Sequence, residues 1–154
     1  MMNCSKPVPT RREALTLGAG IVVTLLAADE SLATPAEADA EIAKFTAGKP
    51  AEDGRISIDL PEIAENGNTV PLSIVVDSPM NADDYVSDIL VISDRNPFPG
   101  VAKFHLTPLS GRAEAATRIR LAATENVIVL AKTSTGKLYI ARKLVKVTVG
   151  GCGG

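Results

Sequence analysis

Two observations predict an all-β fold, an antiparallel β-sandwich, for this chain, and a third adds a flexible arm. From residue 55 onward, short runs rich in Val, Ile and Leu alternate with turn-forming residues at the spacing typical of sandwiches. The single helical pattern lies before this region, which argues against βαβ units and a parallel sheet. The chain ends in Gly-Gly-Cys-Gly-Gly, residues 150–154, which has so few side chains to pack that we expect a flexible arm.

The first segment, residues 1–33, has the pattern of a twin-arginine (Tat) signal peptide. Arg11 and Arg12 directly precede an apolar stretch over residues 14–28, and residues 31–33 (Ser-Leu-Ala) supply the small residues of a cleavage site. The apolar stretch is too short for a stable membrane anchor. The paired arginines favour the Tat route over a plain Sec signal, so we expect export to the periplasm.

Cleavage after Ala33 would leave one ordinary domain with a single cysteine. It removes Cys4, which precedes the apolar stretch and therefore lacks the position of a lipoprotein cysteine. Cys152 remains. A leftover cysteine in an oxidising compartment implies either an intermolecular disulfide or a free reactive thiol.

The mature chain is expected to open with a helix and linker over residues 34–54. Ala and Glu dominate this segment, and Ile42 and Phe45 share one helical face. The sandwich domain follows over residues 55–149, with turn signals such as Asn-Gly-Asn and Ser-Gly between its strands. Strands are predicted over residues 55–60, 70–76, 86–92, 101–106, 116–121, 126–132, 137–141 and 144–149.

Composition argues against several classes of function. Three Phe, two Tyr and no Trp are too few for a platform that stacks bases, so we expect no nucleic-acid partner. Residues 34–99 carry 13 Asp/Glu against 4 Lys/Arg, whereas residues 100–154 carry 2 against 9. Strands from both halves interleave in a sandwich. If the basic half nevertheless forms a patch, it would attract anions on the segments that lead into the arm.

Three internal features have both a structural and a functional interpretation. His105, the sole histidine, lies in an alternating strand without partner ligands and is predicted to be structural, so no metal site is expected. Arg118 and Arg120 share one strand face, which is either solvated or a surface for anions or partners. Phe98 lies in a proline-rigid loop, residues 96–100, and either packs or contacts a partner.

The arm carries the candidate functional site. Cys152 lies between two glycine pairs, Gly150 and Gly151 before it and Gly153 and Gly154 after it. Five extended residues reach about 16 Å, so the thiol could enter narrow pockets of other proteins. Thiolates form disulfides and persulfides, but no adjacent His or Lys activates this one. We therefore expect a covalent carrier that partner enzymes act on, with no catalytic residue, metal or cofactor of its own.

Several further segments, together with the export signal and the terminal motif, match a known family. They are residues 60–72 (Leu-Pro-Glu-Ile-Ala-Glu-Asn-Gly-Asn-Thr-Val-Pro-Leu), 78–80, 96–99, 110–113, 117–121 and 149–154. With them the chain resembles the SoxY family, the sulfur-carrier subunits of the thiosulfate-oxidising Sox system. This resemblance covers nearly the whole chain.

The resemblance implies an immunoglobulin-like sandwich and a heterodimer with a SoxZ-like subunit, which lacks its own signal and travels with SoxY through Tat. It also implies that a haem-containing enzyme loads Cys152 oxidatively with thiosulfate. A sulfate-releasing hydrolase and, where present, a sulfane dehydrogenase would then act on the bound intermediate. The arm would carry that intermediate between their active sites.

Other functions are considered beside this one. An exported structural sandwich could use Cys152 only for an intermolecular disulfide. A Gly-Gly-tailed carrier could hold sulfur as a thiocarboxylate on Gly154, although such carriers are cytosolic β-grasp proteins and the export signal disfavours them. A stand-alone thiol oxidoreductase would need a C-x-x-C pair, which is missing.

Overall fold

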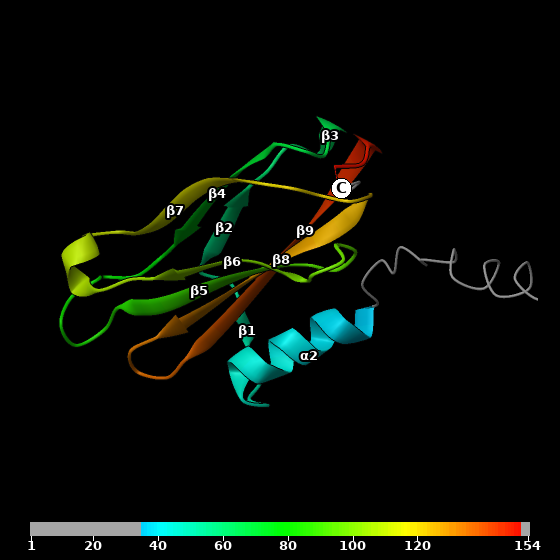
Figure 1. Ribbon diagram of the computed structural model, residues 1–154. Coiled ribbons are helices and arrows are strands. Elements are labelled where there is room, and N and C mark those ends of the chain that lie inside the picture. The colour runs from blue at the N-terminus through cyan, green and yellow to red at the C-terminus, as the bar shows by residue number, and fades with distance from the viewer. Residues whose placement is uncertain (1–34, 152–154) are drawn as a thin grey trace, which may run out of the picture. The chain divides into compact units, whose positions relative to one another are not determined.

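The computed structural model describes residues 35–151, so the export-signal segment and residues 152–154 lie outside it. Within this range the chain forms two β-sheets and a single α-helix, α2 (Pro35–Thr46), which confirms the predicted all-β sandwich with a short N-terminal helix (Figure 1). No helix in the described range is long and apolar enough to span a membrane.

The larger sheet is built on four long antiparallel strands, to which two short strands add in parallel. Its order is β1-β9-β8-β5-β6, and β3 pairs in parallel with the end of β9, as β1 does further back along β9. The edge strand β6 therefore has a free side. The bounds are β1 (Glu52–Asp53), β3 (Ile63–Asn66), β5 (Val86–Ser93), β6 (Gly100–His105), β8 (Glu125–Thr133) and β9 (Leu138–Val149).

The smaller sheet has three antiparallel strands in the order β2-β4-β7. They are β2 (Ile56–Asp59), β4 (Val70–Val76) and β7 (Ala113–Ile119), and a short 3-10 turn, η2 (Pro108–Ser110), leads from β6 to β7. In β4 every second side chain is buried, because successive side chains of a strand point to opposite faces. The buried set of β4, which begins with Val70 and Leu72, faces the larger sheet.

Two hydrophobic clusters hold the larger sheet, one on each of its faces. The main core, between the sheets, includes Ile74, Ile89 and Val129, none of which is exposed to solvent. Helix α2 covers the opposite face through Ala38 and Ile42 (Figure 1). Strands β5 and β8 are therefore covered on both sides, which explains their continuous apolar runs over residues 89–92 and 127–131.

Some predicted strand boundaries differ from the structure. Strand β9 is continuous where a break was predicted after residue 141, because Arg142 pairs with Ile128 of β8 without interrupting the ladder. Strand β7 begins at Ala113 and not at residue 116. The short strands β1 and β3 were not predicted. In β3 only Ala64 is buried, so no alternating pattern marks this strand in the sequence.

Candidate functional site at the root of the arm

The structure describes only the first part of the predicted site. Cys152, Gly153 and Gly154 lie outside the described residues, as do Arg11 and Arg12 of the export signal. The two glycines before the cysteine, residues 150 and 151, are described and are called the arm root below. The second of them is buried, which adds a packing role to the flexibility that the sequence predicts for these glycines.

A chain of backbone hydrogen bonds holds the arm root. The amide of Gly67, in the turn between β3 and β4, donates to the carbonyl oxygen of Val149 at 2.8 Å. The carbonyl oxygen of Gly67 accepts from the amide of Leu121 at 2.8 Å, and the carbonyl oxygen of Leu121 accepts from the amide of Gly151 at 2.9 Å. The end of β9, the 66–68 turn and the segment after β7 are thus tied together where the arm begins.

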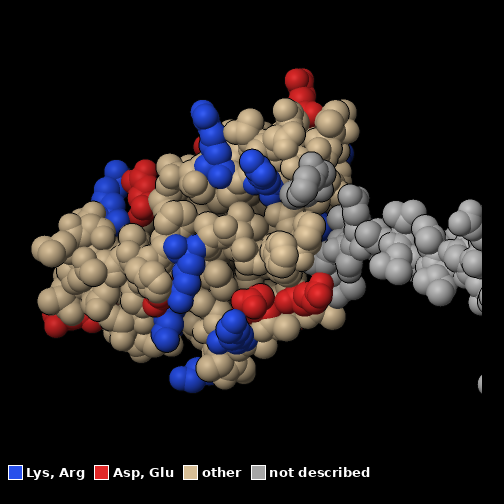
Figure 2. All heavy atoms as spheres, in the orientation of Figure 1, with Lys and Arg blue, Asp and Glu red and all other residues tan. Residues whose placement is uncertain are grey.

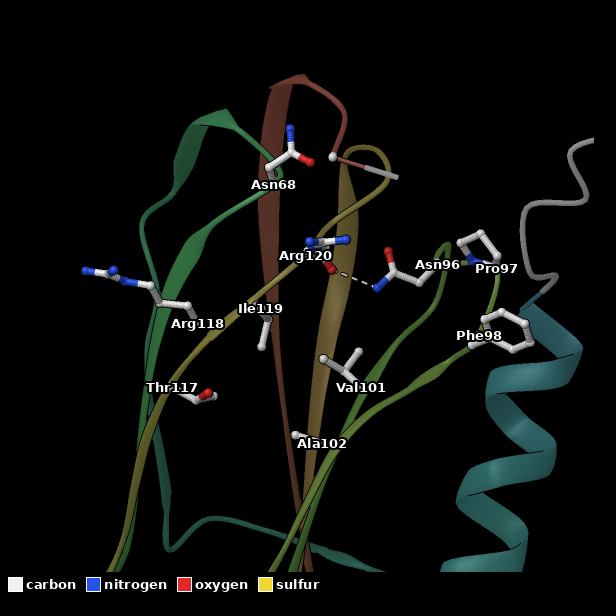
Figure 3. A pocket seen from close by; sticks show the side chains of 11 residues that line it. Asn68, Asn96, Pro97, Phe98, Val101, Ala102, Thr117, Arg118, Ile119 and Arg120 are labelled. Carbon is white, nitrogen blue, oxygen red and sulfur yellow. Dashed lines mark hydrogen bonds between the residues drawn. The ribbon is translucent and has the colours of Figure 1, made fainter. Parts of the chain in front are cut away.

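A cavity of about 490 Å³ opens beside the arm root (Figure 3). It lies between β6 and β7, the edge strands of the two sheets, where the sandwich is not closed by further pairing. Its walls are mainly apolar, with polar groups towards the arm root. The lining residues are Asn68, Asn96, Pro97, Phe98, Val101, Ala102, Thr117, Arg118, Ile119, Arg120 and Gly151.

The buried side chain of Asn96 joins two walls of this cavity. Its amide nitrogen donates to the carbonyl oxygen of Arg120 at 2.8 Å, and its amide oxygen accepts from the backbone of Ala122 at 2.9 Å (Figure 3). Leu121 lies between these two residues in the sequence, and its carbonyl oxygen accepts the hydrogen bond from the amide of Gly151. Asn96 therefore links the 96–98 loop to the chain segment that binds the arm root beside the cavity.

A buried carboxyl group, that of Glu125, anchors the start of the same loop. Its side chain accepts a hydrogen bond from the hydroxyl of Ser93 at 2.6 Å and another from the amide of Arg95 at 3.1 Å. Burial raises the pKa of the Glu125 carboxyl above its ordinary value of 4.5, and the charge of Asp94 adds to the rise, while these hydrogen bonds oppose it. The raised pKa indicates that the charged form of this carboxyl group is disfavoured at this position.

Basic side chains lie around the cavity. Both Arg118 and Arg120 are exposed. Arg118 is directed away from the cavity, whereas Arg120 lies at its rim between Asn68 and Asn96 (Figure 3). On the face that Figure 2 shows, Lys and Arg side chains are spread over the surface, and several of them lie beside Asp or Glu side chains.

The structure does not bring His105 to this site. It lies at the other end of β6, where its Nδ1 is 2.7 Å from a carboxylate oxygen of Asp88, and Lys103 lies 3.8 Å from the same oxygen. The His105 side chain is largely exposed. Over residues 35–151 no group of three His, Cys, Asp or Glu side chains could hold a metal ion.

The family model for the sulfur oxidation protein SoxY matches residues 42–152. The chain belongs to the SoxY family. The match covers most of the chain, and its last residue is Cys152.

Solved structures agree with this assignment. The sulfur carrier protein SoxY from Chlorobium limicola f thiosulfatophilum is 35% identical, with a TM-score of 0.62, over 75% of this chain and 100% of that one. The superoxide reductase (neelaredoxin) from Ignicoccus hospitalis is 18% identical, with a TM-score of 0.55, over 75% of this chain and 94% of that one, and shares the fold alone. The comparison with curated proteins yields no match.

Three supporting residues were not singled out from the sequence. Gly67 was interpreted only as part of an Asn-Gly-Asn turn, and Asn96 only as part of a proline-rich loop. Glu125 lies two residues before Val127, where an apolar run begins, so it shares a strand face with that side chain, and this is a signal that could have indicated a buried carboxyl group. No comparable signal links Gly67 to Leu121, because the two positions meet only in the folded chain.

Proposed function

We propose that this protein is a periplasmic sulfur-compound carrier that holds thiosulfate-derived intermediates covalently on Cys152. The observation that carries the proposal is the family match that ends at this cysteine, one residue beyond an arm root packed beside a cavity. One protein of solved structure that is similar to it, at 35% identity, is a sulfur carrier. Export through Tat, indicated by Arg11 and Arg12, is part of the same proposal.

The chemistry needs only the sulfur atom from this chain. In loading, the thiol of Cys152 and one thiosulfate ion form an S–S bond, and the products are the cysteine S–S–SO3− adduct, one proton and two electrons. The haem-containing partner enzyme accepts the electrons. In the next step a hydrolase adds one water, breaks the bond between sulfur and the sulfonate group, and releases sulfate and one proton. The cysteine persulfide that remains is the substrate of a sulfane dehydrogenase.

The cavity beside the arm root suits such a cargo. Val101, Ala102 and Ile119 give it apolar walls, which would shield a reactive S–S bond from water. Arg120 at the rim offers a positive charge to the sulfonate group. Both properties support a carrier that protects its intermediate between partners.

The surface around the arm root supports the proposed partners, a SoxZ-like subunit and the three enzymes. Phe98 is 83% exposed, so its ring is not packed in the core, and this favours a partner contact for that side chain. Val149 and Ile63, on the paired strands β9 and β3, are each 60% exposed at the same end of the sandwich. We infer that the partner enzymes bind this end of the sandwich while the arm enters their active sites.

Intact-mass analysis of protein purified from thiosulfate-grown cells tests the proposal. We expect adducts of sulfane sulfur or of the S–SO3− group that are removed by a reducing agent and map to the peptide containing Cys152. Two results would contradict it. Sulfur found on the Gly154 carboxyl group would indicate a thiocarboxylate carrier, and a disulfide-linked dimer without any adduct would indicate a structural protein.

A further inference from the structure

We propose that Gly67 is a positioning residue for the carrier arm. Because it has no side chain, the arm root packs against it backbone to backbone, and this contact sets the point from which Cys152 leaves the sandwich. We call the contact of Gly67, Gly150 and Gly151 with the 121–122 segment the glycine clamp. Its consequence for sulfur transfer rests on the proposed function, whereas its geometry does not.

Space is the reason for glycine at all three positions. A Cβ on Gly67 would overlap the carbonyl oxygen of Leu121 and would lie 2.8 Å from the amide nitrogen of Gly151. A Cβ on Gly151 would in turn overlap the backbone of Gly67, and one on Gly150 would overlap the carbonyl oxygen of Ala122. These neighbours are backbone atoms, which cannot swing aside as a flexible side chain could. Close backbone approach of this kind is possible only for glycine.

Backbone conformation does not explain these glycines. Left-handed φ values occur at other glycines among the described residues, and a Cβ at those positions would meet open space; they are Gly48, Gly54, Gly111 and Gly136. Gly67, Gly150 and Gly151 show the opposite combination, an ordinary φ with no room for a side chain. An alanine at position 67 would therefore disturb the contact without straining its own backbone.

The clamp connects the arm root to the rigid part of the molecule. Gly67 bonds to the end of β9 and to Leu121, whose side chain is fully buried in the core. The neighbour of Leu121, Ala122, is held by Asn96. Since Gly151 also lines the cavity, the clamp holds the residue that precedes Cys152 beside the cavity.

Loss of the clamp would change the length and origin of the arm. The last anchored residue would become Val149 at the end of β9, because the bond of Gly151 to Leu121 would be lost. Gly150 and Gly151 would then lie beyond the last anchored residue, which adds two residues, or roughly 7 Å of reach, before Cys152. A longer arm with a less defined origin has more conformations to lose when it enters a partner, so enzymatic transfer should slow.

The test compares Gly67→Ala with Gly100→Ala in the full mature protein. Gly100 is a matched control, because it has no left-handed φ and a Cβ there meets nothing within 4 Å. In the wild type and in Gly100→Ala we expect the amide of Gly151 to be protected from hydrogen exchange. In Gly67→Ala we expect this protection to fall by about tenfold or more, and a spin label on Cys152 to become more mobile.

Function is measured on the same proteins. We expect kcat/KM for loading by the haem enzyme to fall by about tenfold in Gly67→Ala relative to the wild type. Alkylation of Cys152 by iodoacetamide should proceed at the wild-type rate, because the thiol itself is untouched. If Gly67 were needed only for folding, Gly67→Ala would lower the free energy of unfolding, but enzymatic loading would not fall relative to alkylation by iodoacetamide.

Two outcomes would overturn the proposal. One is a wild-type Gly151 amide that exchanges as fast as in an unstructured peptide, which needs no variant and decides the matter even if Gly67→Ala does not fold. The other is a folded Gly67→Ala that keeps wild-type protection and loading. If the Gly151 amide of the wild type is protected but the protein is never loaded, the carrier function fails and the clamp stands. If loading is normal in the wild type and in Gly67→Ala, the carrier function stands and the role of the clamp in transfer fails.

Discussion

The thiol of Cys152 is the one side chain on which the proposed chemistry depends. We predict that Cys152→Ser folds normally but cannot be loaded, since a hydroxyl group does not form a bond to sulfane sulfur under these conditions. The free energy of unfolding should stay within about 0.5 kcal/mol of the wild type. Urea unfolding and thiosulfate-dependent respiration measure the two effects. Cys4→Ser, in the segment that the proposed export would remove, is the matched control, and respiration equal in both variants would contradict the carrier function.

A second prediction concerns the pH dependence of stability at Glu125. Its pKa is raised in the folded protein, so the folded state binds a proton more tightly than the unfolded chain does. The stabilisation that comes from this proton is complete below the ordinary value of 4.5 and is lost as pH rises through the raised pKa of the folded state.

The test compares Glu125→Gln with the exposed control Glu65→Gln. The wild type should lose stability relative to Glu125→Gln as pH rises above the ordinary value of 4.5 and through the raised pKa, a loss that urea unfolding at several pH values measures. No such change is expected relative to Glu65→Gln. If the two glutamine variants followed the wild type in parallel, the raised pKa of Glu125 would have no effect on stability.

The sequence singles out a residue where the residue type itself decides the chemistry. The role of Cys152 stays a prediction, but the residue is singled out in this way, because an isolated thiol between two glycine pairs has few other uses. Asn96 and Gly67 are not, because each acts through partners far along the chain. Asn96 bonds to residues 24 and 26 positions away, and nothing local marks that contact.

Among the elements, helix α2 shows how a short amphipathic segment covers a sheet. Ile42 and Phe45 pack against the outer face of the larger sheet, as their shared helical face predicted. We predict that Ile42→Ala lowers the free energy of unfolding by about 1 to 2 kcal/mol, less than at a fully buried site because Ile42 is only partly buried.

The matched control for this helix is Lys44→Ala, whose side chain is 78% exposed. Its stability should stay within about 0.5 kcal/mol of the wild type. Urea unfolding measures both variants. Equal stability of Ile42→Ala and the wild type would mean that α2 contributes nothing through this contact.

Strands were predictable where burial follows a simple period and not where pairing alone creates them. The central strand β4 was predicted with its true bounds, residues 70–76, because every second side chain is buried. Strand β3 has four residues and a single buried one, Ala64. It exists because it pairs with β9, and a contact between residues 63 and 146 leaves no local trace in the sequence.

For the whole molecule, the fold class was predictable but the cavity was not. A sandwich follows from the number and spacing of apolar runs. The cavity exists because edge strands β6 and β7 lie on the same side of the sandwich without pairing, and because Asn96 holds the loop that closes one end. These are properties of topology, to which no single segment of the sequence corresponds.

The last prediction concerns the fate of the whole molecule in the cell. Changing both Arg11 and Arg12 to Lys keeps the positive charge of the export signal and removes only the guanidinium groups. A Sec signal requires charge and should tolerate this change. A Tat signal is recognised as a specific address, so the protein should stay in the cytoplasm.

A bound SoxZ-like subunit without its own signal should stay behind with it, because the proposed complex travels already folded. Cell fractionation with antibodies to both subunits measures the outcome. Cys152→Ser is the control, since it should be exported normally and thereby separate export from loading. Normal periplasmic amounts of both subunits in the double lysine variant would refute Tat export. Retention of this chain with normal export of the partner would refute joint transport alone, and would leave the carrier chemistry of Cys152 unaffected.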